Sequence, residues 1–537
     1  MGLRWGYVGF AAMIWRTANR DDTMNVTCPV ENRLMGADSS AWDAADASGS
    51  NASGSEPKLA RSMGTFSSFA ISMSVICILA GGVTSFSVGL CSVGGASIGL
   101  GWPLELMFAL IVALTMAQVA SAFPTAGGTY HWAYVLGGRG WGWVTACFSL
   151  AGLITVLAAV DLGLCRFVIG AGSGIGDYHP DDFHPWVQKG AVLLMCALQA
   201  FINHRGIRFT SRLNDLNGYL IMVLAAVLTI GLLAYGLPRA GFQPERLVTF
   251  TNYSGEAGAD VFPPTENIAL LFLMGMLLPA YTLSGFDASA QTSEETVDPE
   301  RAVPRGIIRA VLISGIAGWI FLVAVVLASS DLDAAAKTGE HSFVAIIRDA
   351  MPEWTHVPLF IGLTIAQFLC GLAIVTSASR MAFAFARDGG LPFSRPLARI
   401  SPSHQTPTVA IWTVSAAAAL FAIAIPYTTI ASVCAIFLYL SYVLPTALGM
   451  VAYRRSWTRM GPWHLGRWYQ PLAALCVVGC AALFFVGMLP PNEIALWVVP
   501  GSFVALAVLW FGYMRWHFPG PPPRVLAALR LVDEEKP

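Results

Sequence analysis

The stretch LLPAYTLSGFDASAQTSEETVDPERAVP, residues 277–304, begins as a membrane-spanning helix and then departs from that pattern. The apolar run starts at about residue 268 and is interrupted by Gly285, and Asp287 places a carboxylate close behind the interruption. A charged side chain at the centre of a spanning helix costs ~2.5–3.5 kcal/mol on insertion scales, so it marks a functional candidate. The stretch therefore predicts a broken transmembrane helix with a polar site at the break.

Composition assigns the chain to the integral membrane proteins. Of the 537 residues, 55% are hydrophobic and only 12% are charged, whereas soluble proteins carry roughly 25% charged residues. The net charge of −1 gives no basic excess for binding a nucleic acid. The ten cysteines and nine histidines form no CxxC, HExxH or clustered pattern. We therefore expect no disulfide framework, no metal site, no cofactor and no enzyme active site.

Twelve segments are apolar over about 20 residues, the length that crosses the hydrocarbon core of a bilayer. They lie at 66–91, 102–122, 141–165, 187–203, 217–237, 266–290, 306–329, 357–384, 408–425, 428–452, 470–489 and 493–516. The links between them are short, so residues 65–516 are expected to form one membrane domain. Residues 1–64 are rich in Ser, Ala, Gly and Asp and predict a disordered tail. Residues 517–537 form a second tail.

The distribution of basic residues predicts the orientation in the membrane. With both termini on one side, 25 of the 31 Lys and Arg residues fall on that side. Basic residues are enriched in cytoplasmic loops. Both tails are therefore expected to be cytoplasmic, in a multi-pass protein of the plasma membrane.

A second glycine-rich interruption corresponds to the one at Gly285. The first apolar segment contains ICILAGGVTSFSVG, with Gly81 and Gly82 near its centre. Paired interruptions at matching positions of two repeats point to a transporter substrate site. The first and sixth segments correspond in a five-plus-five repeat, to which the eleventh and twelfth are additions. The alternative is that these glycines only allow helices to pack closely.

Two adjacent breaks suit a small zwitterionic ligand. An unwound turn leaves backbone N–H and C=O groups without helical partners, which is costly in lipid but useful beside a polar ligand. The N-terminal end of a half-helix favours a carboxylate, and freed carbonyl oxygens favour an ammonium group. The pattern therefore indicates an amino acid or a related amine as the substrate.

Three motifs carry a family resemblance. They are SAFPTAGGTYHWAYVLGGRGWGWV at 121–144, SGFDASAQTSEETVDPERAVPRGI at 284–307, and SRMAFAFARDGGLPFSRPLARIS at 379–401 followed by TPTVAI at 406–411. In this order, on twelve helices, they resemble amino-acid permeases of the amino acid–polyamine–organocation superfamily, nearest the amino acid/choline branch that includes GABA and choline permeases. The resemblance implies an all-α leucine-transporter fold, a five-plus-five inverted repeat with helices 1 and 6 interrupted, working by alternating access.

The resemblance also implies which residues bind the substrate. The sequence ILAGGV matches the family's break in helix one, beside the substrate carboxylate, and YTLSGFD matches the break in helix six, around the amino group and the gate. Tyr281 would close over the ligand as a lid. The implied substrate-binding residues are Ile78, Ala80, Gly81, Gly82, Val83, Tyr281, Ser284, Gly285 and Asp287.

One feature departs from the family pattern. Many proton-coupled relatives carry a lysine within helix five, but the matching region near Ile221 has none, and no lysine lies between residues 190 and 336. Lysine-mediated coupling is therefore in doubt. Exchange, facilitated transport and coupling through a carboxylate stay open, and so does a co-transported or exchanged ion or solute.

The remaining charges have alternative interpretations. We expect Asp161 to pair with Arg166 or to line an outer vestibule rather than to bind the substrate. Glu294 and Glu295, which follow helix six, either solvate a loop or form an intracellular gate with the following arginines. The candidate gate arginines are Arg380 and Arg387.

These observations predict a secondary active transporter that moves amino acids or related small amines across the lipid bilayer. Choline or polyamine transport, GABA-specific transport and a transporter-like membrane sensor are the alternatives. A membrane enzyme is disfavoured by the scattered histidines, and the sequence leaves the particular substrate open.

Overall fold

The computed structural model describes residues 63–125, 127–173, 184–425, 427–489 and 492–521. All but the last two residues of the expected N-terminal tail, 1–64, and much of the expected C-terminal tail, 517–537, lie outside these ranges. Helices make up most of the described chain, and the strand-like contacts within it are two isolated β-bridges, Met63 with Thr296 and Tyr453 with Trp457.

The predicted all-α membrane architecture is confirmed. Within the described ranges, nine helices are long and apolar enough to cross a membrane, and two shorter apolar helices, Ile268–Thr282 and Thr408–Ala424, accompany them. The fourth predicted segment, 187–203, forms α9 (Pro185–His204), which packs against α20 (Thr408–Ala424). The other predicted segments form α3 (Thr65–Ile76) with α4 (Ile78–Thr84) and α5 (Phe86–Val93), α6 (Trp102–Ala122), α8 (Arg139–Gly172), α10 (Ile207–Gly231), α12 (Ile268–Gly275) to α14 (Ala288–Gln291), α15 (Pro299–Ala328), α18 (Glu353–Arg387), α21 (Tyr427–Ala452), α22 (Tyr469–Gly487) and α23 (Glu493–Leu509).

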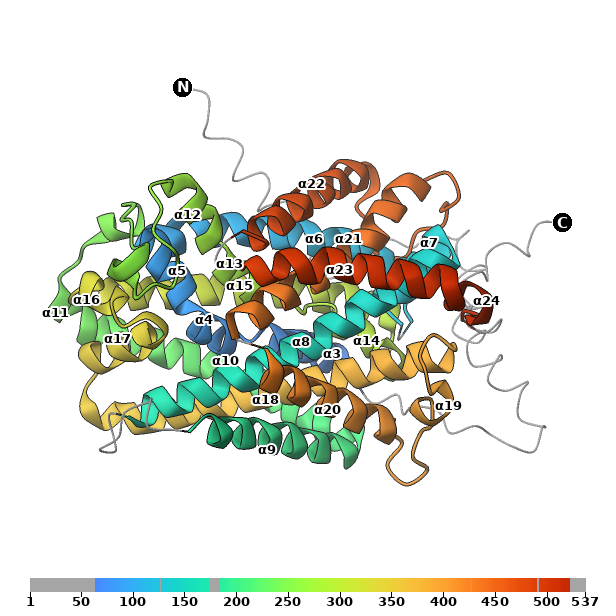
Figure 1. Ribbon diagram of the computed structural model, residues 1–537, viewed down its shortest axis with the longest axis horizontal. Helices are drawn as coiled ribbons and strands as arrows, with labels where there is room; N and C mark the ends of the chain where they lie inside the picture. Colours follow the sequence, from blue (N-terminus) through green and yellow to red (C-terminus); the bar gives the residue numbers. More distant parts are fainter. Residues whose placement is uncertain (1–62, 126, 174–183, 426, 490–491, 522–537) are drawn as a thin grey trace, which may run out of the picture. The chain divides into compact units, whose positions relative to one another are not determined.

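The long helices run in nearly one direction across the bundle. In Figure 1, α8, α9, α18 and α23 cross the view between two ends. One end carries α7 (Thr129–Gly137), α19 (Ser394–Leu397) and α24 (Arg515–His517). We call it the basic end, because the loops expected to hold most of the Lys and Arg residues lie there. The opposite end carries α11 (Leu237–Ala240), α16 (Leu332–Ala336) and α17 (Ser342–Ala350).

The interrupted first helix lies inside the bundle. Its half-helix α3 packs against α15, α10 and α18, while α8 packs against both α18 and α21. Ile71, Met73 and Ile76 of α3 are buried in the main hydrophobic core. Because other helices surround α3, most of its faces are apolar, as expected for a helix that is buried on all sides.

Several predicted loops are partly helical. Residues 123–140 contain α7, and α10 begins at Ile207 inside the segment expected as the loop 204–216. The first turns of α10 are polar but packed, because Asn214 is buried and Asp215 accepts a hydrogen bond from Ser67 Oγ (3.0 Å). The helix therefore extends past the apolar run from which its start was predicted.

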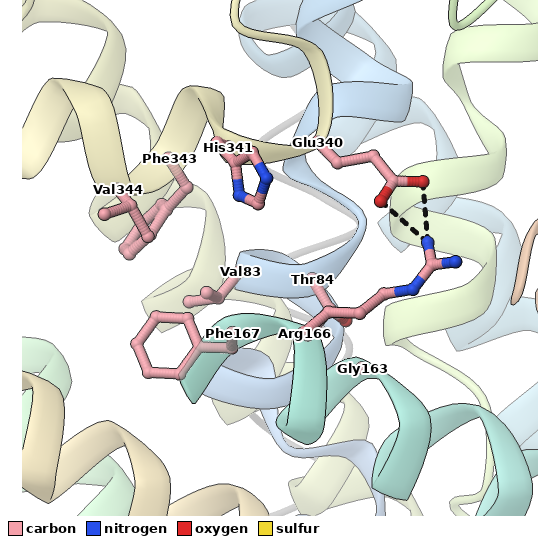
Figure 2. Close-up of a pocket in the computed structure, with 9 residues that line it drawn as sticks. All are labelled: Val83, Thr84, Gly163, Arg166, Phe167, Glu340, His341, Phe343 and Val344. Atoms are coloured by element: carbon pink, nitrogen blue, oxygen red, sulfur yellow. Dashed lines mark hydrogen bonds and ion pairs between the residues drawn. The ribbon is translucent and has the colours of Figure 1, made fainter. Parts of the chain in front are cut away.

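The link between α15 and α18 is also partly helical. It contains α16, the short 3-10 turn Gly339–His341 and α17. At the opposite end, this turn faces the last part of α8, where Glu340 lies against Arg166 (Figure 2). The link thus forms a cap over the end of α8.

Candidate functional site

Helix six is interrupted where the sequence predicted. The half-helix α13 (Leu277–Thr282) ends before residues 283–287, and α14 follows. Gly285 has a φ of +86°, and a Cβ atom added to it would lie 2.4 Å from Val75 Cγ1. A side chain at this position would therefore suffer both backbone strain and a steric clash. The break depends on glycine for two separate reasons.

Helix one is interrupted at a different residue from the predicted pair. One break falls at Cys77, with φ 27° and ψ 82°, between α3 and α4, and a second interruption at Ser85 separates α4 from α5. Gly81 and Gly82 lie within helix α4 instead. A Cβ on Gly81 would lie 2.8 Å from Thr282 Oγ1 and 2.9 Å from Thr282 Cα. Gly81 therefore allows α4 to pack closely on α13, as in the alternative interpretation of these glycines, and the predicted position of the break is wrong by about one turn.

The helix-six interruption and α14 contact the half-helix α3 through serine side chains. Ser72 Oγ donates to the backbone oxygen of Phe286 (2.7 Å), which lies in the helix-six break. The N–H of Ser289 donates to Ser72 Oγ (3.0 Å), and Ser289 Oγ donates to the backbone oxygen of Ser68 (2.5 Å). Together with the contact between Gly81 and Thr282, these bonds bring both halves of helix one against both halves of helix six.

The side chain of Asp287 is held by hydrogen bonds from residues around the helix-six break. Its Oδ1 accepts from Tyr442 Oη (2.7 Å), and its Oδ2 accepts from Gln291 Nε2 (2.9 Å). Tyr442 Oη in turn accepts from the N–H of Gly285 (3.1 Å). Asp287 is fully buried. Its carboxylate therefore ties the unwound turn to α21, and the geometry fits a positioning group better than a direct counter-charge for the substrate.

The sequence interpretation missed Tyr442, although its setting offered a signal. Tyr442 lies in the apolar segment LYLSYVLP, and a buried tyrosine in such a segment usually finds a hydrogen-bond partner. The partner could not be identified, because 155 positions separate Tyr442 from Asp287. Cys77 was missed as the break because a cysteine gives no sequence signal for a positive φ.

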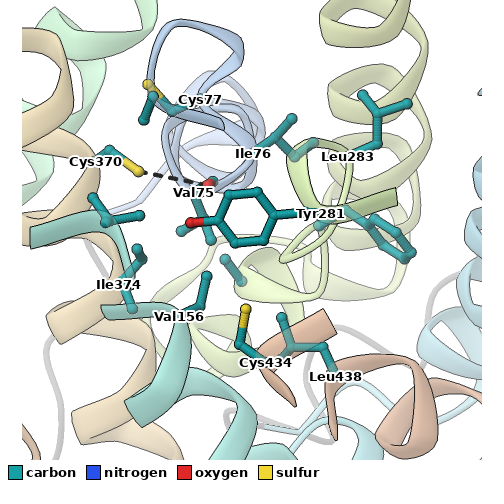
Figure 3. Close-up of a cluster of buried hydrophobic side chains, with 14 of the residues drawn as sticks. Val75, Ile76, Cys77, Val156, Tyr281, Leu283, Cys370, Ile374, Cys434 and Leu438 are labelled. Carbon is teal, nitrogen blue, oxygen red and sulfur yellow. Dashed lines mark hydrogen bonds between the residues drawn. The ribbon is translucent and has the colours of Figure 1, made fainter. Parts of the chain in front are cut away.

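Tyr281 projects into the centre of the bundle. Its side chain is 7% exposed, and its ring lies among side chains from four different helices (Figure 3). These neighbours include Val75, Val156, Ile374 and Leu438. Ser284 Oγ, which was also predicted to bind substrate, donates to the backbone oxygen of Tyr281 (2.7 Å). Tyr281 thus lies between the broken helices and the helices α8, α18 and α21 that pack around them.

All nine predicted substrate-binding residues are buried, and the structure places them in two facing groups. One group lies on α4 and the other lies in or beside the helix-six break, and α4 packs against α13. The α4 group is Ile78, Ala80, Gly81, Gly82 and Val83, and the helix-six group is Tyr281, Ser284, Gly285 and Asp287.

The acidic residues after helix six do pair with arginines of α18, as one of the two interpretations anticipated. Arg380 Nε lies 3.4 Å from Glu295 Oε1, and both side chains are 1% exposed. Arg387 Nη1 lies 3.2 Å from Glu294 Oε1. Burial raises the pKa of Glu295, and the neighbouring Arg380 partly opposes that increase. The Arg380–Glu295 pair is therefore buried at the basic end, whereas the Arg387–Glu294 pair beside it is partly exposed.

A second buried group joins α7 to the end of α18. Asp388 accepts from Tyr130 Oη (3.1 Å) and lies 2.8 Å from His131 Nε2. Burial tends to raise the pKa of Asp388, but the hydrogen bonds and charges of His131 and Arg387 hold it below its usual value. The motif at 121–144 therefore contributes to the same end of the molecule as the motifs at 284–307 and 379–401.

Asp161 does not pair with Arg166, the ion-pair partner expected from the sequence. Asp161 is fully buried, and its carboxylate accepts from Gln199 Nε2 (2.7 Å) and from the Cys196 thiol (3.0 Å). Arg166, one turn further along α8, contacts Glu340 instead. Five positions along a helix place two side chains on different faces. Asp161 therefore faces α9, away from Arg166.

Comparison with known proteins agrees with this architecture. Residues 63–513 match the model of the amino acid permease family. The chain is 31% identical to Amino-acid permease BAT1 of Arabidopsis thaliana over 88% of this chain and 96% of the relative. It is 25% identical to the GABA-specific permease of Saccharomyces cerevisiae over 87% of this chain and 84% of the relative. A homolog of BAT1 in Oryza sativa subsp. japonica is 28% identical over 87% of this chain and 94% of the relative.

The helical bundle with its paired interruptions defines an all-α, multi-pass membrane transporter. Within that class, the match over most of the chain makes the assignment specific. The chain belongs to the amino acid permease family of the amino acid–polyamine–organocation superfamily.

Proposed function

We propose that this permease moves its substrate by alternating access, as a secondary transporter, with the substrate held between the interruptions of helix one and helix six. The observation that carries the proposal is the direct contact of the helix-six break with the half-helix α3, from Ser72 Oγ to the backbone oxygen of Phe286. Broken helices that meet inside a membrane bundle expose backbone dipoles to one shared space. Rocking of the surrounding helices would then open that space to each side in turn.

The nine predicted residues supply the proposed site. Backbone groups on α4 and around Gly285 face the carboxylate and ammonium of the substrate, and the Tyr281 ring closes over them as a lid. Asp287 holds the helix-six break in shape through Tyr442 and Gln291. The apolar neighbours of Tyr281 favour the neutral part of an amino acid.

GABA is a specific candidate substrate because one relative is named a GABA-specific permease. Other amino acids are candidates of equal standing, since the relatives from Arabidopsis thaliana and Oryza sativa are named only as amino-acid permeases. We further propose a plasma-membrane location with the basic end cytoplasmic, from the excess of Lys and Arg in the loops expected there.

Vesicles containing the purified full-length chain test this function. Saturable uptake of radiolabelled amino acids or GABA, accelerated by internal unlabelled substrate, is the expected result. A panel of leucine, glutamate, lysine, GABA and choline, each with and without a pH gradient, would identify the substrate class and the coupling. Unsaturated conductance would indicate a channel, and binding without flux would indicate a sensor.

The role of Asp287 has its own test in the same vesicles. Asp287→Asn removes the charge but keeps the size of the side chain. We expect uptake of cationic and neutral substrates to fall by similar factors, because the carboxylate holds the break through Tyr442 and Gln291. A selective loss of cationic substrates would instead make Asp287 a direct ligand.

A further inference from the structure

A small cavity lies at the opposite end, directly beyond the proposed substrate site. It has a volume of about 30 Å³, which is room for roughly two water molecules. Val83 and Thr84 of α4 form its inner wall, so it adjoins the predicted binding residues. Arg166 of α8 and Glu340 and His341 of the 339–341 turn also line it (Figure 2).

An ion pair of opposite charges stands at this cavity. Arg166 Nη1 lies 2.7 Å from both carboxylate oxygens of Glu340. The two side chains remain 36% and 48% exposed. Partly exposed ion pairs contribute little to stability, because water already screens and solvates the charges. Separating this pair therefore costs far less than separating the buried pair of Arg380 and Glu295.

The backbone that carries Glu340 is anchored independently of the ion pair. Arg348 Nη2 donates to the backbone oxygens of Gly170 (3.3 Å) and Ala171 (2.9 Å), at the end of α8. His341 fits against Gly170, where an added Cβ would lie 2.7 Å from His341 Nδ1. A cation at the C-terminal end of a helix is favourably placed. The two charged groups can therefore separate while the segment 339–350 stays docked on α8.

We propose that Arg166 and Glu340 form an outer binding subsite for a zwitterionic amino acid, which rests on the proposed transport function. The guanidinium of Arg166 binds the substrate carboxylate, and the carboxylate of Glu340 binds the substrate ammonium. The substrate enters between the two side chains and replaces one charged contact with two. When no substrate is present, the side chains pair with each other.

The physical basis is charge complementarity of the pair to the ligand. Charge-assisted hydrogen bonds to carboxylates and ammonium groups are the strong ones in proteins. A zwitterion satisfies both side chains at once, whereas a simple cation or anion satisfies one and leaves the other without its former partner. The subsite therefore selects zwitterions before they reach Tyr281 and the broken helices.

Equilibrium binding to the purified full-length chain tests the subsite apart from transport. Radiolabelled leucine and GABA are the probes, and equilibrium dialysis gives the number of molecules bound per chain. We expect two sites for at least one probe in the native chain and one site in both Arg166→Gln and Glu340→Gln. The site that remains should be lost in Tyr281→Ala.

A matched control is Arg239→Gln. Arg239 is at the same end and donates to the backbone oxygen of Asp349 (3.2 Å), outside the cavity. This variant should keep both binding sites, and thermal unfolding of all variants confirms that each is folded. One site in the native chain and in every folded variant would overturn the subsite and leave the transport function standing. No binding of either probe would overturn both.

Uptake kinetics give a second readout. Arg166→Gln and Glu340→Gln should raise the KM for external substrate by roughly three- to tenfold, the size expected for losing one partly exposed charged hydrogen bond. The maximal rate should stay within about twofold, since these side chains lie outside the central site. An unchanged KM in both variants would contradict the proposal.

Discussion

The two interrupted helices of this permease solve the same structural problem in different ways. Helix six unwinds over residues 283–287, and two of its backbone groups are bound by side chains from other helices, with Tyr442 accepting from Gly285 and Ser72 donating to Phe286. Helix one breaks at Cys77, which adopts a positive φ without being glycine, and is interrupted again at Ser85. The helix-six break is a polar turn held by hydrogen bonds, whereas the helix-one break at Cys77 is a local kink within packed helices.

The comparison shows where each break is sensitive to substitution. The helix-six break depends on a glycine, a hydroxyl and a carboxylate, so changes there remove specific bonds or introduce clashes. The helix-one break depends on neighbours that hold the backbone, since the Cys370 thiol lies 3.6 Å from the backbone oxygen of Val75 and the Cys77 thiol lies 3.9 Å from that of Ala366. Mutations at the two breaks should therefore differ in size and even in sign.

The largest effect is expected from Gly285→Ala. The positive φ costs an alanine ~1–2 kcal/mol, and the clash with Val75 adds ~1–3 kcal/mol of overpacking. The free energy of unfolding in detergent should fall by about 2–5 kcal/mol, measured by chemical denaturation and circular dichroism. Combining the change with Val75→Ala should remove the clash and leave the backbone strain. A single variant as stable as the native chain would disprove the left-handed turn.

Tyr442→Phe should have the next largest effect. It removes the hydroxyl shared by the Gly285 N–H and the Asp287 carboxylate, and each buried polar group left without a partner costs about 1–3 kcal/mol. The same denaturation measurement applies, together with the rate of vesicle uptake. Tyr439→Phe is the matched control, because its hydroxyl lies at 3.5 Å from Glu105 Oε1 and makes a weaker bond. Equal losses in both variants would contradict the proposed role of Tyr442.

Alanine substitutions at Gly81 and Gly82 test whether these glycines allow close helix packing or form the break of helix one. Gly81→Ala should lower the free energy of unfolding by ~1–3 kcal/mol, because its Cβ would overlap Thr282. Gly82→Ala should be neutral or stabilising by up to ~1 kcal/mol, since its Cβ would meet only Leu322 at 3.7 Å and alanine favours a helix. If both variants lost the same stability, the packing explanation would fail.

The smallest change in the free energy of unfolding is expected at Cys77, where the order of the glycine and alanine variants should reverse. Inside a helix, glycine is less stable than alanine by ~0.5–1 kcal/mol. At Cys77 the positive φ should reverse that order, making Cys77→Gly more stable than Cys77→Ala by ~0.5–1 kcal/mol. Cys434, in the interior of α21, is the control at which alanine should remain better. The same order at both positions would place the break elsewhere.

Much of the fold was predictable from the sequence, because a spanning helix is recognised by the residues of its own segment. A run of about 20 apolar residues identifies a spanning helix wherever it packs, and the predicted segment 102–122 coincides with α6. Polar helix ends were less predictable, since α10 begins at Ile207, ten residues before the start of its predicted segment at 217. Such ends are stabilised by neighbours like Ser67, which sequence periodicity does not show.

The candidate site was predictable in part. The alternation of acidic and basic residues at the basic end suggested a paired interpretation, and Arg380 with Glu295 and Arg387 with Glu294 confirm that these residues pair. The pairing of Asp161 with Arg166 was wrong, because helical geometry turns the two side chains to different faces. Nearness in sequence is a poor guide to ion pairs when a helix intervenes.

The sequence by itself determined the membrane class, the order of the helices and the interruption at Gly285, because hydrophobic length and the helix-breaking tendency of glycine are properties of short segments. Only the tertiary structure decided that helix one breaks at Cys77, that Gly81 packs on Thr282, and that Tyr442 holds the break of helix six. Those outcomes depend on contacts between residues far apart in the chain, where packing selects the partner and the local sequence does not.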